Sequence, residues 1–257
     1  MRRTLAAVAG FVALTRDYNA ALACIATSAL RRASNAAEFA ARILAVAGVP
    51  LRVLSGAQEA AASFGGATAD AACDGARIAV LDIGGGSTEC AVGIDGAVAA
   101  VRSIEIGSVR VAERFPALLG GSSGAVARAA AQEARCAIRA ALAPLRELTP
   151  VAQVRCVAGT PLTIAAIVSA TNVDAVSGTT LARAAVDCTI ERLLDLDLAQ
   201  RRALPGMLAQ RADILAGGAL VLSEALRALD VADGLLEAND LLLGYLLGTV
   251  AGSGSTE

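Results

Sequence analysis

The stretch VLDIGGGSTE (80–89) places three consecutive glycines between two acidic residues, at the end of an apolar run. A glycine triplet between two apolar strands can expose successive backbone N–H groups with no Cβ in the way, which makes a concave site for an anion such as phosphate. Asp82 enters this turn and Glu89 leaves it. If the flanking strands pair as a hairpin, both carboxylates lie near its tip, where their hard oxygen atoms suit Mg²⁺ or Mn²⁺. A plain hairpin, whose glycines only relieve crowding, is the alternative interpretation.

The composition excludes several classes of chemistry. All 22 basic residues are arginine and the chain has no histidine, so a Walker-type phosphate loop and a Ser/His/Asp arrangement are excluded. A dinucleotide fingerprint is disfavoured, because Glu89 stands where the third glycine is needed and a strand-like segment follows. Proton transfer near neutral pH must then depend on carboxylates.

Charge and hydropathy limit the partners and the location. A net charge of −2 without a basic run argues against nucleic acid. We find no apolar run of about 18 residues, so we expect a soluble protein with no membrane partner. The opening MRRTLAAVAGFVAL imitates a secretory signal but is better explained as an amphipathic helix, which favours the cytoplasm. The six cysteines form no C-x-x-C pair and are expected to be buried thiols.

The sequence pattern predicts an α/β fold. Apolar runs at 20–26 and 51–55 predict two parallel strands, joined by one helix that stops at Gly48. A second helix is expected to start after Gly56.

Further along, the strands 77–83, 88–94 and 97–106 predict an antiparallel meander with turns at the glycine triplet and at Asp95-Gly96. Residues 123–148 predict one long helix, and 152–160 a further strand before a helix. The remainder predicts several helices, followed by a flexible tail at 251–257.

The glycine turn looks like the second phosphate-binding loop of the exopolyphosphatase/guanosine pentaphosphate phosphatase (Ppx/GppA) family, within the actin-like ATPase superfamily. Six further stretches resemble that family in the same order: ATSALRRASN (26–35), LSGAQEA (54–60), EIGSVRVAERF (105–115), VAGTPLTIAAI (157–167), RADILAGGALVL (211–222) and NDLLLG (239–244). The resemblance implies a two-lobed actin-like ATPase (ribonuclease H-like) fold with an incomplete first lobe. Residues 1–57 would be its remnant, 238–257 would return to it, and 58–237 would form the second lobe.

The resemblance also implies a role for each matching residue. Glu59 falls on the catalytic glutamate, the general base for the attacking water, whereas alone it would be explained as a helix N-terminal acid. Asp82 and Glu89 fall on positions that contact the metal, Mg²⁺ or Mn²⁺. The phosphate-binding positions are Arg31, the backbone of Gly84, Gly85, Gly86 and Ser87, and a second glycine turn at Gly159 and Thr160. Arg110 and Glu113 are interpreted as a structural i,i+3 pair.

The family usually begins with a first phosphate loop, and this chain starts in the helix that follows it. We therefore expect about 50 residues to be missing from the usual domain of about 300. A misplaced start codon, a gene fragment and a degenerate member are the three competing explanations. The substrate site is expected in a cleft between the lobes.

Three functions follow from these observations. The first is a phosphohydrolase that releases terminal phosphate from inorganic polyphosphate or guanosine pentaphosphate by metal-assisted attack of water. The second is a non-catalytic module that binds polyphosphate or (p)ppGpp. The third is an actin-like ATPase or kinase. A homodimer is compatible with each of them.

Overall fold

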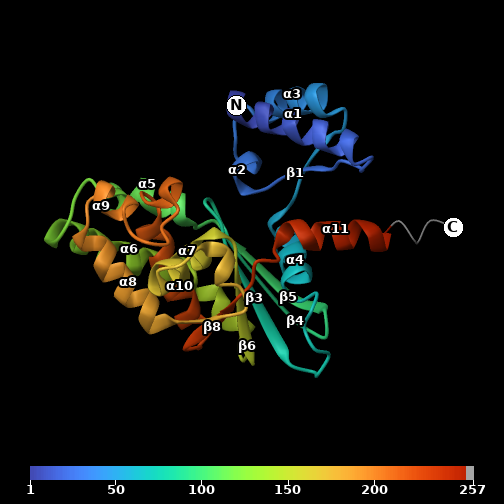
Figure 1. Ribbon diagram of the computed structural model, residues 1–257. Coiled ribbons are helices and arrows are strands. Elements are labelled where there is room, and N and C mark those ends of the chain that lie inside the picture. Colours follow the sequence, from blue (N-terminus) through green and yellow to red (C-terminus); the bar gives the residue numbers. More distant parts are fainter. Residues whose placement is uncertain (253–257) are drawn as a thin grey trace. The chain divides into compact units, whose positions relative to one another are not determined.

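The structure is a computed structural model that describes residues 1–252. The chain divides into two compact units, Met1–Gly56 and Ala57–Glu257. Both combine helices with strands, so the predicted α/β class is confirmed (Figure 1). The expected return of 238–257 to the first lobe stays a prediction, and residues 253–257 of the expected tail lie outside the described residues.

The first unit contains a two-stranded parallel sheet, as the sequence predicts. Its elements are α1 (Arg2–Asp17), β1 (Cys24–Ala26), α2 (Ser28–Arg31), α3 (Ala36–Ala47) and β2 (Leu51–Val53). The single helix expected between the strands was wrong, since α2 and α3 are separate. Asn35, a residue type that favours the start of a helix, precedes α3. Gly48 ends α3 in the left-handed conformation with φ 72°, which agrees with the predicted stop.

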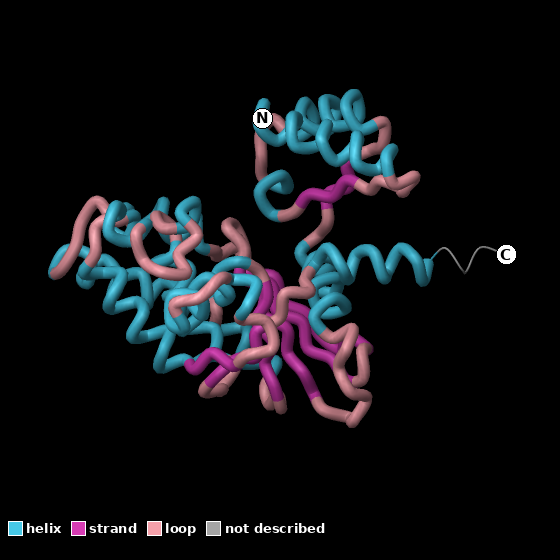
Figure 2. Tube along the Cα trace, viewed as in Figure 1, coloured by secondary structure: helices cyan, strands magenta, loops and turns pink. Residues whose placement is uncertain are grey.

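The second unit is built on a six-stranded mixed sheet in the order β5-β4-β3-β6-β8-β7. Strands are coloured magenta in Figure 2. Its strands are β3 (Arg77–Ile83), β4 (Thr88–Ile94), β5 (Ala97–Ile104), β6 (Gln153–Val157), β7 (Thr180–Ala182) and β8 (Asp233–Leu236). Strands β3, β4 and β5 form the predicted antiparallel meander, and β6 pairs in parallel with both β3 and β8. The prediction of helices alone after residue 181 was wrong, because β8 and the end of β7 lie there. Both strands are too short to show an alternating pattern.

Helices cover both faces of this sheet (Figure 1). The helices that follow β2 are α4 (Gly56–Ala67), α5 (Ser108–Arg114), α6 (Ala125–Ala141), α7 (Gly159–Ser169), α8 (Arg183–Asp195), α9 (Leu198–Arg202), α10 (Leu215–Ala228) and α11 (Leu241–Gly252). Short 3₁₀ turns lie at η1 (Pro116–Leu119), η2 (Ala143–Leu148), η3 (Val173–Ala175) and η4 (Ala209–Arg211). The long helix expected at 123–148 is therefore divided, and Pro144 accounts for the break because its ring cannot continue an α-helix.

The larger core lies between one face of the sheet and α5, α6, α7, α8 and α10. The opposite face carries a smaller core beneath α4, in which Ala60, Phe64 and Ala67 pack with Val80, Ala91 and Val157. Burial of a side chain the size of Phe64 contributes about 1.5–3 kcal/mol. Helix α4 is therefore held on the sheet by one apolar stripe.

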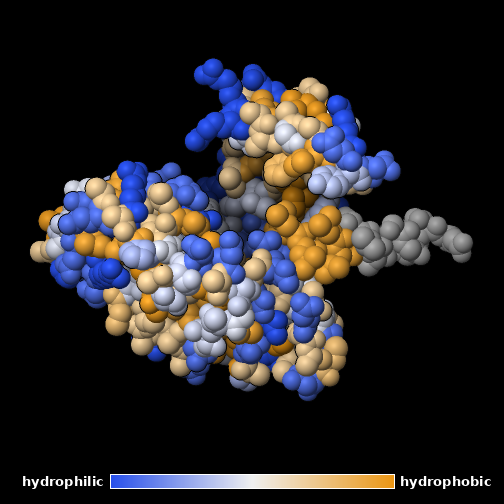
Figure 3. Space-filling view, viewed as in Figure 1, coloured by the Kyte–Doolittle hydropathy of each residue, from blue (hydrophilic) through white to orange (hydrophobic). Residues whose placement is uncertain are grey.

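Helix α11 packs closely against α4. A Cβ at Gly244 would lie 1.7 Å from the carbonyl oxygen of Ala62, and one at Gly66 would lie 2.0 Å from that of Asp240, so both positions require glycine. The side chains of Leu242 and Leu246 remain more than half exposed, and apolar atoms gather over α11 in Figure 3. No helix in the described part of the chain combines the length and apolar character needed to span a bilayer.

Candidate active site

Three loops of the second unit lie at one edge of its sheet. Asp82 pairs with Val157 and Cys156 with Leu236 in the parallel ladder of β3, β6 and β8. Because parallel strands end at the same edge, the glycine loop (84–87) that follows β3, the turn after β6 and the segment after β8 lie together. Both predicted glycine turns are thereby brought side by side.

The glycine loop is anchored through its carbonyl groups. The backbone N–H of Ser108 donates to the carbonyl of Gly84 (3.0 Å), and that of Val109 donates to the carbonyl of Gly85 (3.0 Å). A Cβ at Gly107 would lie 2.6 Å from both carbonyl oxygens, so only glycine fits there. In the described part of the chain, the N–H of Gly85 makes no backbone hydrogen bond. The loop therefore turns its carbonyls toward α5 and leaves an amide for an anion.

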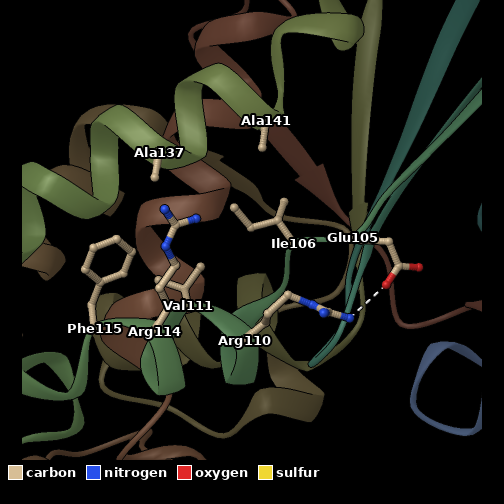
Figure 4. Close-up of a pocket in the computed structure, with 8 residues that line it drawn as sticks. All are labelled: Glu105, Ile106, Arg110, Val111, Arg114, Phe115, Ala137 and Ala141. Carbon is tan, nitrogen blue, oxygen red and sulfur yellow. Dashed lines mark hydrogen bonds and ion pairs between the residues drawn. The ribbon is translucent and has the colours of Figure 1, made fainter. Parts of the chain in front are cut away.

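Arg110 completes this anchoring. Its Nε donates to the carbonyl of Gly86 (2.8 Å), and its Nη2 forms an ion pair with Glu105 (2.8 Å). The predicted pair with Glu113 was wrong, since Arg110 contacts the glycine loop and pairs with Glu105 instead (Figure 4). A cavity of about 110 Å³ lies beside it, lined by Glu105, Ile106, Arg110, Val111, Arg114, Phe115, Ala137 and Ala141. None of the predicted site residues lines this cavity.

Asp82 and Glu89 face each other across the β3 and β4 hairpin as paired residues. Both are buried, with 8% and 1% of their surfaces exposed. Burial raises the pKa of Asp82 to about 6 and that of Glu89 to about 7. The charge of Glu59 raises both pKa values further, which shows that the three carboxylates lie close together.

Serine hydroxyls hold this carboxylate pair. The hydroxyl of Ser63 donates to Asp82 Oδ2 (2.6 Å), and the hydroxyl of Ser103 donates to Glu89 Oε1 (2.7 Å). Each bond lowers the pKa of its carboxyl and offsets part of the effect of burial. Ser103 is the β5 residue paired with Glu89, so a polar row crosses three strands on the face that α4 covers.

Helix α4 carries Glu59 in its first turn, and Glu59 is 7% exposed. At the other end of α4, Arg155 Nη1 donates to the carbonyl of Ala67 (2.8 Å). The same guanidinium pairs with Glu237 at 3.0 Å. The helix is thereby fixed to β6 and to the segment that follows β8.

The second glycine turn holds an arginine. A Cβ at Gly159 would lie 2.2 Å from the guanidinium carbon of Arg211, so Arg211 lies against the first turn of α7. Burial lowers the pKa of Arg211, and no carboxylate pairs with it in the described part of the chain. Ala158 precedes the turn with φ 70° and ψ 177°, a conformation that normally requires glycine. Thr160 is buried against Gly218.

The remaining predicted phosphate ligand, Arg31, belongs to the first unit. It ends α2, and its Nη1 donates to the carbonyl of Leu54 (3.0 Å). Its role in binding phosphate stays a prediction.

Sequence reasoning missed the residues that support the predicted ones. Gly107 and Arg211 lie inside the stretches that resemble the family, yet no local pattern assigns them a role. The only sequence signal for Arg211 is that an arginine stands just before an apolar helical segment. Ser63 had none, because a serine inside an alanine-rich helix is unremarkable.

The mixed sheet with helices packed against it defines the second unit as an α/β fold. A solved exopolyphosphatase-like protein superposes with a TM-score of 0.87 at 26% identity, covering 98% of this chain and 84% of that one. Exopolyphosphatase 2 of Mycobacterium tuberculosis is 32% identical over 266 residues, which span 95% of this chain and 80% of the relative.

Residues 1–238 match the Ppx/GppA phosphatase family. The chain therefore belongs to this family, and the predicted enzyme class, a phosphoanhydride hydrolase of the exopolyphosphatase type, is confirmed. A guanosine-5'-triphosphate,3'-diphosphate pyrophosphatase of Vibrio cholerae is 39% identical over 90 residues, 35% of this chain and 18% of the relative.

Proposed function

We propose that this protein releases the terminal phosphate of inorganic polyphosphate, with guanosine pentaphosphate as a second substrate of the same chemistry. The relative that matches nearly the whole chain is an exopolyphosphatase, whereas the match to the guanosine pentaphosphate enzyme covers 35% of it. The observation that carries the proposal is the buried pair of Asp82 and Glu89 beside an anchored glycine loop, with the charge of Glu59 acting on both.

In the proposed reaction, water attacks the terminal phosphorus. The new P–O bond forms as the bond to the bridging oxygen breaks, and the shortened chain leaves with that oxygen. Glu59 accepts the proton of the water as general base. No histidine or lysine is needed for these steps.

The phosphate is bound by backbone and by one guanidinium in this proposal. The N–H groups of Gly85, Gly86 and Ser87 form the first contact. The N–H of Gly84, which the sequence also assigned to the phosphate, instead donates to the carbonyl of Ser87 (3.0 Å) and closes the loop. The N-terminal end of α7, at Gly159 and Thr160, carries a partial positive charge and forms the second contact with the phosphate. Arg211 adds a full positive charge next to that end.

A divalent cation, Mg²⁺ or Mn²⁺, fits the donors present. No group of three or more His, Cys, Asp or Glu side chains within the described residues is arranged to hold a metal ion. Mg²⁺ is commonly held by one or two carboxylates together with water and substrate phosphate, and Asp82 and Glu89 supply such a pair. When bound, the cation would neutralise charge on the phosphate oxygens.

The test is phosphate release, followed by a colorimetric molybdate assay, from polyphosphate and from guanosine pentaphosphate with Mg²⁺ present. Release from either substrate supports the proposal. Saturable binding of both without release would instead identify a binding module. Consumption of ATP with phosphorylation of an acceptor would identify a kinase.

A further inference from the structure

Ser63 lies one helical turn after the proposed general base. Glu59 and Ser63 are four residues apart on α4, so they share one face of the helix. Ser63 is 1% exposed and donates its hydroxyl hydrogen to Asp82 Oδ2 at 2.6 Å. A single helix thus carries Glu59 and the group that holds Asp82.

The bond restricts the carboxylate of Asp82. Within the described residues, Ser63 is the side chain that donates a hydrogen bond to it, and the bond occupies Oδ2 alone. A hydrogen bond to an ionised group is short and directional. Oδ1 is therefore left for a ligand, and the orientation of the carboxylate depends on one hydroxyl.

The same bond restricts the helix. The contacts of Ala60 and Phe64 with the sheet are apolar and therefore non-directional. The bond from Arg155 fixes the far end of α4. The bond from Ser63 to Asp82 is likewise directional and fixes the half of the helix that carries Glu59 over β3. It thereby sets the position of Glu59 relative to Asp82.

We propose that Ser63 is a positioning residue for phosphoanhydride hydrolysis. It holds Asp82 Oδ2 and fixes the position of α4, and thereby that of Glu59. This inference rests on the proposed function. It adds a residue that contacts neither substrate nor water in the reaction.

The test compares Ser63→Ala with Ser63→Thr, which keeps the hydroxyl. Loss of such a supporting bond typically costs about 10- to 100-fold in activity or metal affinity. We expect Ser63→Ala to lower kcat by that amount with little change in KM. We also expect it to weaken Mn²⁺ binding, measured by electron paramagnetic resonance without substrate, by a similar factor. Ser63→Thr should return most of both.

A matched control removes another buried hydroxyl of the same region. Thr68 donates to the carbonyl of Phe64 (2.7 Å) and has no bond to a carboxylate. Thr68→Val should lower the melting temperature at most, while kcat and Mn²⁺ affinity stay at wild-type values.

The outcomes separate this inference from the proposed function. Wild-type kcat and Mn²⁺ affinity in Ser63→Ala would overturn it, and so would equal losses in the Ala and Thr variants. A wild type that binds Mn²⁺ in a Ser63-dependent way but releases no phosphate would overturn the proposed function alone. A wild type with neither property would overturn both.

Discussion

Asp82 and Glu89 are paired residues of one hairpin, so their buried carboxylates lie next to each other on the sheet face that α4 covers. Two adjacent carboxylates withdrawn from water favour a proton or a cation between them. The nearby charges of Glu59 and Asp240 increase this preference. The arrangement has a measurable effect on stability.

The stability of the cation-free protein should fall as pH rises from about 4 to 7. The folded-state pKa values of about 6 and about 7 lie above the ordinary values of 3.8 and 4.5. A carboxyl group whose pKa is raised in the folded state stabilises the fold at a pH below its ordinary pKa. This stability is lost as the pH rises through the raised pKa. Each pKa unit corresponds to about 1.4 kcal/mol. Urea unfolding at pH 4 and pH 8, with chelator, measures the effect.

The double variant Asp82→Asn with Glu89→Gln is the control for this pH dependence. It should flatten the slope between pH 4 and 7, because the two titrating groups are gone. An unchanged slope would assign the effect to other groups.

Glu59→Gln should reduce phosphate release by about 10²- to 10⁴-fold, the usual contribution of a general base. Folding should persist, because the amide keeps the shape of the side chain. A phosphate-release assay measures the loss of activity, and the far-ultraviolet circular dichroism spectrum checks that the variant folds. Glu147→Gln, on an exposed side chain, is the matched control. A Glu59→Gln variant with wild-type activity would show that another residue is the general base.

Arg211→Gln should raise KM by about 10- to 100-fold, since hydrogen bonds to charged groups contribute about 1.5–3 kcal/mol. The melting temperature should not fall, because the guanidinium has no carboxylate partner in the described part of the chain and burial already disfavours its charge. Steady-state kinetics with polyphosphate and a thermal melt test this. Unchanged KM would remove Arg211 from the proposed phosphate site. Arg192→Gln, on an exposed side chain of α8, serves as the control.

Gly107→Ala should destabilise the protein by about 1–3 kcal/mol, the usual cost of inserting a methyl group into a packed site. The new Cβ would lie 2.6 Å from the carbonyl oxygens of Gly84 and Gly85, so the loop must shift and activity should fall with stability. Gly121→Ala is the control, because nothing lies within 4 Å of its Cβ position. Equal effects of the two variants would argue against the anchoring role.

Ala158→Gly should stabilise the protein by about 1 kcal/mol. A non-glycine residue at φ 70° and ψ 177° carries backbone strain of about 1–3 kcal/mol, and glycine relieves it at some entropic cost. Chemical denaturation measures the difference. A loss of stability would show that the Ala158 side chain contributes packing that outweighs the strain.

Local sequence predicted the features with a local cause. The meander from β3 to β5 follows from three strand-like segments that are separated by turns at Gly84–Ser87 and Asp95-Gly96. The end of α3 follows from Gly48. The strands β7 and β8 are too short to carry such a pattern. They are strands because neighbouring strands of the sheet supply their hydrogen bonds.

By itself, the sequence determined the glycine turn, the acidic residue on each side of it and the family to which the chain belongs, because glycine runs and motif order are local properties. Only the tertiary structure showed that Ser63 holds Asp82, 19 residues away, and that Arg211 lies against Gly159. These contacts join segments far apart in the chain. Their partners are chosen by how α4 and the segment before α10 pack on the sheet, and no single segment encodes that packing.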